Sequence, residues 1–356
     1  MKNYLFFICA CFYSAVMLGQ DLHFSQFNEN PALVNPALTG ANGMRGSINN
    51  KTQWKSVTTP YRTYGLSVEA RNSTVKKKAG GNLENLPPSE RVPGKYAAGL
   101  SLYRDKAGDG RLTLTQINLS LATFLKTGEK SALSFGLQTS YAVRRIDDSR
   151  FVYPNQYNPA YGYDTDFNSG EAGMTDKFRY LDLATGMMFS YDDEVRGLKD
   201  HKERRGHLGF SVYHLTQPKQ KYLSKKSDAL YMKYVSHGDI LRSIPNSRTG
   251  VFLSYLFQMQ ASHMEIVAGG MFRYYLKNDT RYTGYVKRST ISGGLYYRLK
   301  DAVIVKGMFE WQEQHAIILS YDINVSKLAK SSNIRGGLEF TYRYTSGHPY
   351  LYQKLK

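Results

Sequence analysis

The loop 163–171 holds the side chains best spaced for chemistry. Asp164, Asp166 and Asn168 alternate in it, as the oxygen ligands of a calcium-binding loop do. Gly170 comes one place later than the glycine of such a loop. We therefore keep cation binding by residues 164–171 as an alternative, and we predict neither a metal site nor a cofactor.

Catalytic motifs are absent from the rest of the sequence. It contains no G-x-S-x-G, H-E-x-x-H, Walker A or C-x-x-C pattern, and its eight histidines stand singly, without zinc-site spacing. The acidic stretch 105–110 joins two predicted strands, where Asp-Gly is ordinary turn chemistry. We predict that the protein is not an enzyme; the alternative is a membrane-embedded hydrolase with a dispersed Ser/His/Asp site.

The first residues have the layout of a secretory signal peptide. Lys2 is followed by an apolar run that ends at Gly19, and we predict residues 1–19 as a cleaved signal peptide. Cys9 and Cys11 both lie in this run, so the mature chain would have no disulfide and no thiolate chemistry. Lipid attachment at Cys11 is the alternative.

The formal net charge is +18. Such a charge can indicate nucleic-acid binding, but an exported protein rarely meets nucleic acid, so we expect another anionic partner. Anionic lipopolysaccharide or an acidic protein fits better. The basic residues gather in the predicted connections 76–78, 199–205 and 219–226. They form either solvated loops or a basic docking surface.

Alternation of apolar and polar residues is the strongest pattern in the chain. Every second residue from Leu133 to Val143 is mostly apolar, and small or polar residues stand between them, as in a strand with one apolar face. Similar patterns predict thirteen strands, many of them as long as a tilted membrane strand, which needs about 9–11 residues. These lie near 45–54, 61–70, 95–104, 111–125, 131–145, 178–191, 206–216, 249–260, 263–276, 287–299, 302–312, 315–325 and 335–345.

An even strand number is typical of bacterial outer-membrane barrels, and residues 229–236 are the best candidate for a further strand. We predict an all-β, antiparallel transmembrane barrel of about 14 strands, within roughly 12–16. The short connections 126–130 and 260–263 would lie at one end, and the long connections 146–177 and 217–248 at the other.

The aromatic residues agree with a barrel. The 29 tyrosines and 17 phenylalanines gather at predicted strand ends, where an aromatic girdle meets the membrane interface. The alternative is a soluble two-sheet sandwich, which also has alternating strands.

The start of the mature chain, residues 20–44, is predicted not to form a strand. Asn30-Pro31 and Asn35-Pro36 are two successive kinks, because proline excludes the preceding residue from the helical region and asparagine favours turns. We expect this segment at the periplasmic mouth or in the lumen of the barrel, either as a structural plug or as a contact for a partner.

The same stretch carries a family resemblance. Together with the later Gln53 and Trp54, it resembles the N-terminal signature of the PorP/SprF family, and residues 320–326 and 335–339 resemble that family's C-terminal end. The chain departs from the family pattern at residues 27–29, Phe-Asn-Glu. The signature residues, which are also the predicted partner contacts, are Phe24, Ser25, Gln26, Asn30, Pro31, Asn35, Pro36, Ala37, Gly40, Gln53 and Trp54.

The resemblance implies an outer-membrane barrel of the type IX secretion and gliding machinery of Bacteroidetes. Its expected role is to bind a cargo or adhesin protein and help secrete it or anchor it at the cell surface. The expected partners are other secretion components, that cargo, and outer-membrane lipid or lipopolysaccharide, without nucleic acid. Residues 45–345 would form the barrel and 346–356 a C-terminal tail.

The second function left open is a diffusion porin or small-molecule channel. Polar residues predicted to face the lumen permit it: Asp182, Glu265, Lys306, Glu310 and Asp322. For the expected docking function, the basic loops and the acidic, aromatic segment 151–176 are the contact surfaces that we predict.

Overall fold

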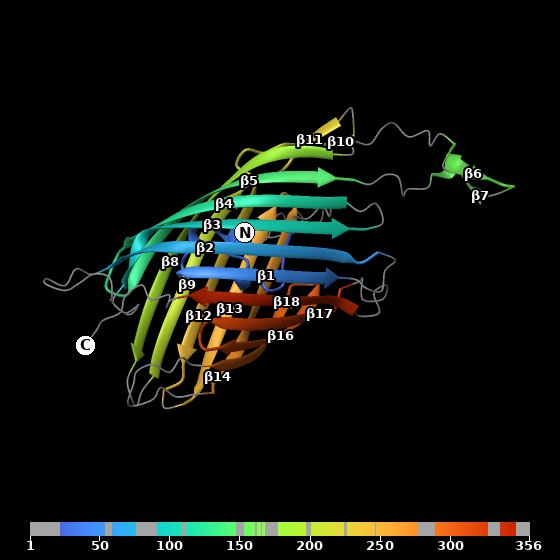
Figure 1. The fold of residues 1–356 in the computed structure, drawn as a ribbon. Coiled ribbons are helices and arrows are strands. Elements are labelled where there is room, and N and C mark those ends of the chain that lie inside the picture. Colours follow the sequence, from blue (N-terminus) through green and yellow to red (C-terminus); the bar gives the residue numbers. More distant parts are fainter. Residues whose placement is uncertain are drawn as a thin grey trace, which may run out of the picture.

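One closed sheet of antiparallel strands dominates the structure (Figure 1). The computed structural model describes residues 22–53, 59–75, 91–108, 112–146, 153–160, 162–164, 166–167, 177–196, 201–223, 226–245, 247–276, 289–326 and 335–346. Within these residues fourteen strands form the wall, and each pairs with its neighbours along the chain. They are β1 (Met44–Gln53), β2 (Tyr61–Val75), β3 (Arg91–Ala107), β4 (Leu112–Lys126), β5 (Ser131–Arg145), β8 (Lys177–Arg196), β9 (His201–Tyr213), β12 (Lys233–Ser243), β13 (Thr249–Gln260), β14 (His263–Tyr275), β15 (Thr290–Arg298), β16 (Ala302–Trp311), β17 (His315–Asn324) and β18 (Arg335–Ser346).

The wall closes where the first and last strands meet. β1 pairs with β18 from Met44 opposite Ser346 to Gln53 opposite Gly337, so the sheet has no unpaired edge. The predicted antiparallel barrel of about 14 strands is therefore confirmed. The two-sheet sandwich is wrong, because all fourteen strands belong to one ring.

The further strand, β12, exists but does not have the predicted bounds. It runs from Lys233 to Ser243 instead of 229–236. Ser236 and Arg242 share the outward face of Ile240, so alternation marks this strand only weakly. The residues just before it pair elsewhere, since β11 (Lys226–Ala229) pairs with β10 (Lys219–Leu223) outside the barrel wall.

The barrel has a terminal rim, where β1 begins and β18 ends, and an opposite loop rim. The turns 127–130 and 261–262 lie at opposite rims, and long connections occur at both, so the predicted division into a short-turn end and a long-loop end is wrong. Strand β12 is the reason. Because it adds one crossing of the barrel between the two turns, the turn 261–262 lies at the rim opposite to the turn 127–130. The connections 146–176 and 214–232 share the loop rim.

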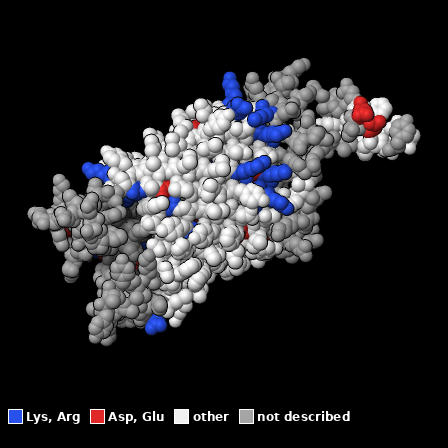
Figure 2. Space-filling view, viewed as in Figure 1, with Lys and Arg blue, Asp and Glu red and all other residues white. Residues whose placement is uncertain are grey.

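The outer surface of the wall is apolar and the inner surface is polar. The outward Leu137 and Leu181 are each 66% exposed, whereas the inward Gln138 and Asp182 are each 2% exposed. Lipid covers such an outer face in a membrane barrel. Figure 2 shows this surface as a broad uncharged area with Lys and Arg gathered toward the rims.

The remaining elements are small. Besides β10 and β11, a two-stranded sheet forms from β6 (Tyr157–Asn158) and β7 (Gly162–Tyr163), next to the short helix η6 (Pro154–Gln156). This group stands away from the barrel beyond the loop rim (Figure 1). No helix among the described residues is long and apolar enough to cross a membrane.

Candidate functional site

Residues 22–43, called the luminal segment below, lie against the inner surface of the barrel wall. Three short helical turns follow one another there: η1 (Phe27–Glu29), α2 (Pro31–Val34) and η2 (Pro36–Leu38). Each Asn-Pro pair begins a turn, because proline suits the first helical position. Asn35 also accepts a hydrogen bond from the Ala37 backbone N–H at 2.9 Å through its Oδ1, which closes a local turn.

The first contact region joins the start of the luminal segment to the last two strands. The backbone N–H groups of Ser25 and Gln26 donate to the two carboxylate oxygens of Glu339, at 2.8 and 3.1 Å. The Ser25 hydroxyl donates to Asp322 Oδ2 at 2.6 Å. Both acids are almost fully buried, and a buried carboxylate is tolerated only when hydrogen bonds replace its water. The luminal segment supplies those bonds.

Two cations complete this region. Arg298 Nη2 donates to Ser25 Oγ at 2.7 Å, and Arg298 Nε lies 3.1 Å from Glu265 Oε1. Lys51 Nζ donates to the same hydroxyl oxygen at 3.2 Å. Burial, assisted by the nearby Lys51, lowers the pKa of His23 to about 4 and outweighs the opposing effect of Glu265. His23 is therefore neutral at pH 7.

The second contact region centres on Glu29. Its Oε2 lies 2.9 Å from Arg45 Nη2 of β1 and 2.9 Å from Arg343 Nη1 of β18. Burial raises the pKa of Glu29, but Arg343 and Arg45 more than offset this and lower it to about 2. Arg45 also lies 3.9 Å from Glu69 Oε1 of β2, whose other oxygen accepts a hydrogen bond from the Gly40 N–H. Glu29 thus holds the segment to the strands at which the barrel closes.

The third contact region is a floor of three glycines on neighbouring strands, Gly136 of β5, Gly186 of β8 and Gly209 of β9. A Cβ atom on Gly136 would collide with the backbone of Pro36 and Ala37, and one on Gly186 would collide with the Asn35 side chain. This glycine floor lets the second Asn-Pro pair lie directly on the wall.

Polar groups fix Asn35 and its neighbours on the glycine floor. Asn35 Nδ2 donates to the Met187 carbonyl oxygen at 3.0 Å and lies 3.0 Å from His237 Nε2. Ser211 Oγ donates to the Val34 carbonyl oxygen at 2.6 Å, and Ser134 Oγ donates to the Ala37 carbonyl oxygen at 3.0 Å. These bonds satisfy backbone groups that would otherwise be buried without partners.

Most of the predicted signature residues come together in the luminal segment. Phe24 packs against Tyr103 with ring centroids 6.0 Å apart, and Asn30 Oδ1 accepts a hydrogen bond from Asn49 Nδ2 at 2.9 Å. Gly40 has a φ of +70°, which favours glycine. The signature residues buried in this segment are Phe24, Ser25, Gln26, Asn30, Pro31, Asn35, Pro36, Ala37 and Gly40.

The two later signature residues are not part of this group. Gln53 is half-buried at the loop-rim end of β1, and Trp54 lies outside the described residues. Sequence reasoning also missed Glu29, which belongs to the stretch that departs from the family pattern. Its one available signal was an acidic side chain among apolar and amide neighbours.

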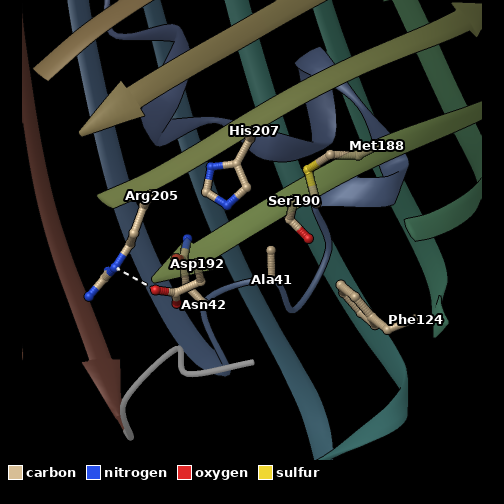
Figure 3. A pocket seen from close by; sticks show the side chains of 8 residues that line it. All are labelled: Ala41, Asn42, Phe124, Met188, Ser190, Asp192, Arg205 and His207. Atoms are coloured by element: carbon tan, nitrogen blue, oxygen red, sulfur yellow. Dashed lines mark ion pairs between the residues drawn. The ribbon is translucent and has the colours of Figure 1, made fainter. Parts of the chain in front are cut away.

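A small, open hollow lies beside the end of the luminal segment, near the terminal rim (Figure 3). On one side Arg205 Nε lies 3.7 Å from Asp192 Oδ1, and Phe124 lies on the other side (Figure 3). The hollow therefore has a charged side and an apolar side. Its lining residues are Ala41, Asn42, Phe124, Met188, Ser190, Asp192, Arg205 and His207.

Residues 153–167, called the arm below, contain the predicted cation ligands Asp164 and Asp166. Asp164 Oδ1 accepts a hydrogen bond from the Asp166 N–H at 2.9 Å, which is turn geometry. Asn168 and the rest of the loop to residue 171 lie outside the described residues. In the part of the chain that the structure describes, no three His, Cys, Asp or Glu side chains are grouped to hold a metal ion.

The solved structures that resemble this chain have low sequence identity to it. Among solved structures it is similar to the toluene transporter TbuX of Ralstonia pickettii, with 10% identity, a TM-score of 0.46, and coverage of 90% of this chain and 94% of that chain. It is also similar to the CymD monoaromatic hydrocarbon channel, with 11% identity, a TM-score of 0.42, and coverage of 93% and 96%.

A search of curated proteins found no match. The sequence model of the type IX secretion system membrane protein PorP/SprF matches residues 16–344, which is nearly the whole chain and includes the luminal segment and the barrel strands up to Tyr344 of β18. The closed barrel with its apolar outer surface is an outer-membrane fold, and the chain therefore belongs to the PorP/SprF family of type IX secretion system membrane proteins.

Proposed function

We propose that this protein is a docking barrel that binds a cargo or adhesin protein and helps to secrete it or to hold it at the cell surface, with no chemistry of its own. The occupied lumen is the observation that carries the proposal. The luminal segment is bonded to the first strand, to β5, β8 and β9, and to the last two strands. A barrel filled in this way is better suited to presenting surfaces than to conducting solutes.

The second candidate function is a small-molecule channel. The similar structures TbuX and CymD are a transporter and a channel by name, and the inward faces here carry charged residues. The contacts of these charges favour docking, however, because Asp322 and Glu265 are engaged with Ser25 and Arg298.

Conductance of the purified barrel in a planar bilayer separates the two functions. The docking proposal predicts a silent barrel at neutral pH, and a steady open pore in the unmodified protein would support the channel. A hydrolase, the third class, predicts turnover of lipid or peptide that is lost on replacing a single Ser or His.

The arm is the contact surface that we propose for the cargo. Tyr157, Tyr163 and Phe167 are 55%, 60% and 48% exposed, and the two tyrosine rings meet edge to face at 5.1 Å. Exposed aromatic side chains are enriched where proteins bind one another. Asp164 and Asp166 beside them would favour a basic partner surface.

The proposal as a whole is tested by comparing surface proteomes with and without the gene. We expect one or a few proteins to disappear from the surface while others still reach it, and re-expression of the gene to restore them. If every secreted protein stayed in place after deletion, the docking function would be wrong.

A further inference from the structure

Five basic residues form an outward-facing cluster at the loop rim, called the basic patch below. They are all exposed and lie on strands that are consecutive in the barrel wall except for the intervening β4. Figure 2 shows Lys and Arg gathered at this end of the barrel. The residues are Arg62 on β2, Arg104 on β3, Arg145 on β5, and Lys177 and Arg179 on β8.

The basic patch stands at the level of lipid headgroups. Side chains of a strand alternate between two faces, so Arg62 shares the lipid-facing side with Tyr64, which is 48% exposed. Arg179 likewise shares it with Leu181, which is 66% exposed. Moving from the rim toward the middle of the barrel, the chain thus passes from cations to aromatic and apolar residues, as at a membrane interface.

The charges of the basic patch are not neutralised within the described part of the wall. Arg145 lies directly opposite Lys177, and like charges at this spacing, about 4.5–5.5 Å between Cβ atoms, repel each other. On the neighbouring strand Arg145 faces Thr113. None of the residues directly opposite Arg62, Arg104 or Arg145 is acidic, so an external anion would relieve the repulsion.

The opposite rim provides a contrast. Arg204 and Arg242 also face each other on the outer surface, but Arg204 lies opposite Asp193 of β8 as well. Asp193 in turn lies 2.8 Å from Lys130. At the terminal rim, therefore, the wall itself supplies the negative charge that the basic patch lacks.

Among the outward strand positions that the structure describes near the loop rim, the basic patch occupies one part of the circumference. At outward positions near the loop rim, β12, β14 and β15 carry the uncharged residues Tyr234, Met264 and Tyr297, and the uncharged Val325 follows β17. A general belt of positive charge would continue around the barrel. A cluster on one side indicates a ligand with a defined place.

We propose that the basic patch binds the phosphate groups of a lipopolysaccharide-type glycolipid in the outer leaflet. The loop rim faces outward in this assignment, because both barrel ends of the chain lie at the other rim and the long connections 146–176 and 214–232 lie here. Arginine and lysine bind phosphate by charge-assisted hydrogen bonds. The patch extends over four strand spacings, about 19 Å, so its ligand carries more than one phosphate or a large phosphorylated headgroup.

The triple variant Arg145→Gln/Lys177→Gln/Arg179→Gln tests this site, with Arg204→Gln/Arg242→Gln as the matched control at the other rim. Each barrel is purified in mild detergent, inserted into phospholipid nanodiscs, and titrated with phosphorylated lipid A. Each basic residue near an anionic lipid raises the binding affinity roughly fivefold. We expect about 100-fold weaker binding for the triple variant and unchanged binding for the control. Heat-modified mobility in gels verifies that both variants are folded.

Three ligand arms identify the source of the phosphate. Dephosphorylated lipid A should bind the wild-type barrel as weakly as phosphorylated lipid A binds the triple variant, and inorganic phosphate at the same phosphate concentration should not compete. Equal binding of the two lipid A forms, or equal affinity of the triple variant and the control, would overturn the proposal. So would an acidic protein that displaces lipid A from the wild-type patch in a pull-down.

Discussion

Glu29 and Arg343 meet inside the barrel although 314 positions separate them in the sequence: the Nη1 atom of the arginine lies 2.9 Å from Oε2 of the carboxylate. Arg343 belongs to β18, the strand that closes the wall against β1. Arg45 of β1 contacts the same carboxylate oxygen at 2.9 Å. One side chain of the luminal segment therefore joins both sides of the seam.

Replacing Glu29 by glutamine should destabilise the barrel strongly. The change leaves Arg45 and Arg343 with only more distant carboxylates, Glu69 at 3.9 Å and Glu310 at 3.7 Å, and breaking a buried ion pair costs about 3–5 kcal/mol. Urea unfolding of the refolded barrel in detergent measures the effect. As the control, Asp193→Asn removes the partner of the exposed Lys130 and should have little effect, because solvent screens such a pair. Equal effects of the two variants would contradict the role of Glu29.

Stability should fall in acid through the same carboxylate. The pKa of Glu29 is about 2 in the folded barrel, against an ordinary value of 4.5, so the unfolded chain takes up the proton first. The stabilisation is complete above pH 4.5 and is lost as the pH falls from 4.5 toward 2. Urea midpoints measured across this range should drop more steeply for the wild type than for Glu29→Gln. Parallel curves would show that another group causes the drop.

A methyl group on the glycine floor should displace the luminal segment. The Cβ of Gly136→Ala would collide with the backbone of Pro36 and Ala37, and overpacking of this kind costs about 1–3 kcal/mol. We expect a lower unfolding midpoint and brief conducting openings in planar bilayers. Gly293→Ala and Gly307→Ala are the controls, because a Cβ at either position meets open space. If these controls conduct as often as Gly136→Ala, the glycine floor does not seat the segment.

Removing aromatic contacts from the arm should weaken cargo display without affecting the barrel. Tyr163→Ala/Phe167→Ala deletes two exposed rings, and an interface hot spot contributes about 2 kcal/mol or more. We expect at least about tenfold less cargo at the surface, measured by quantitative surface proteomics, at an unchanged barrel level. Tyr231→Ala is the matched control, since Tyr231 is 56% exposed in another connection of the loop rim. Normal display in the double variant would rule out the arm.

The fold could be predicted from sequence where lipid imposes a pattern. Leu133 to Val143 alternate because one face of β5 meets lipid, and this period is local in the chain. The alternation does not mark the bounds of β12, because its outward residues include the polar Ser236 and Arg242. The further strand was therefore predicted with the wrong bounds, 229–236, and the turns 126–130 and 260–263 were assigned to one rim as if it were absent.

The site could be predicted only in part, because its contacts join distant positions. The Asn-Pro pairs marked a segment outside the wall, and the inward positions of Asp322 and Glu265 followed from the strand period. The residues next to Gly136 and Gly186 in the sequence do not show that these two glycines contact Asn35 and Pro36. Any small inward-facing residue would have similar sequence neighbours. The pairing of Ser25 with Glu339 likewise needs the closed ring before the two residues can meet.

The contacts of the luminal segment with β17 and β18 also have a consequence for biogenesis. Residues 22–43 leave the ribosome ahead of every strand, yet Ser25, Gln26 and Glu29 find Asp322, Glu339 and Arg343 only after the final hairpin has been made. A chain truncated before that hairpin would leave the backbone N–H groups of Ser25 and Gln26 without the Glu339 carboxylate that they contact, although the glycine-floor contacts could already form. We therefore expect the final hairpin to close the wall and to fix the start of the luminal segment in the same step.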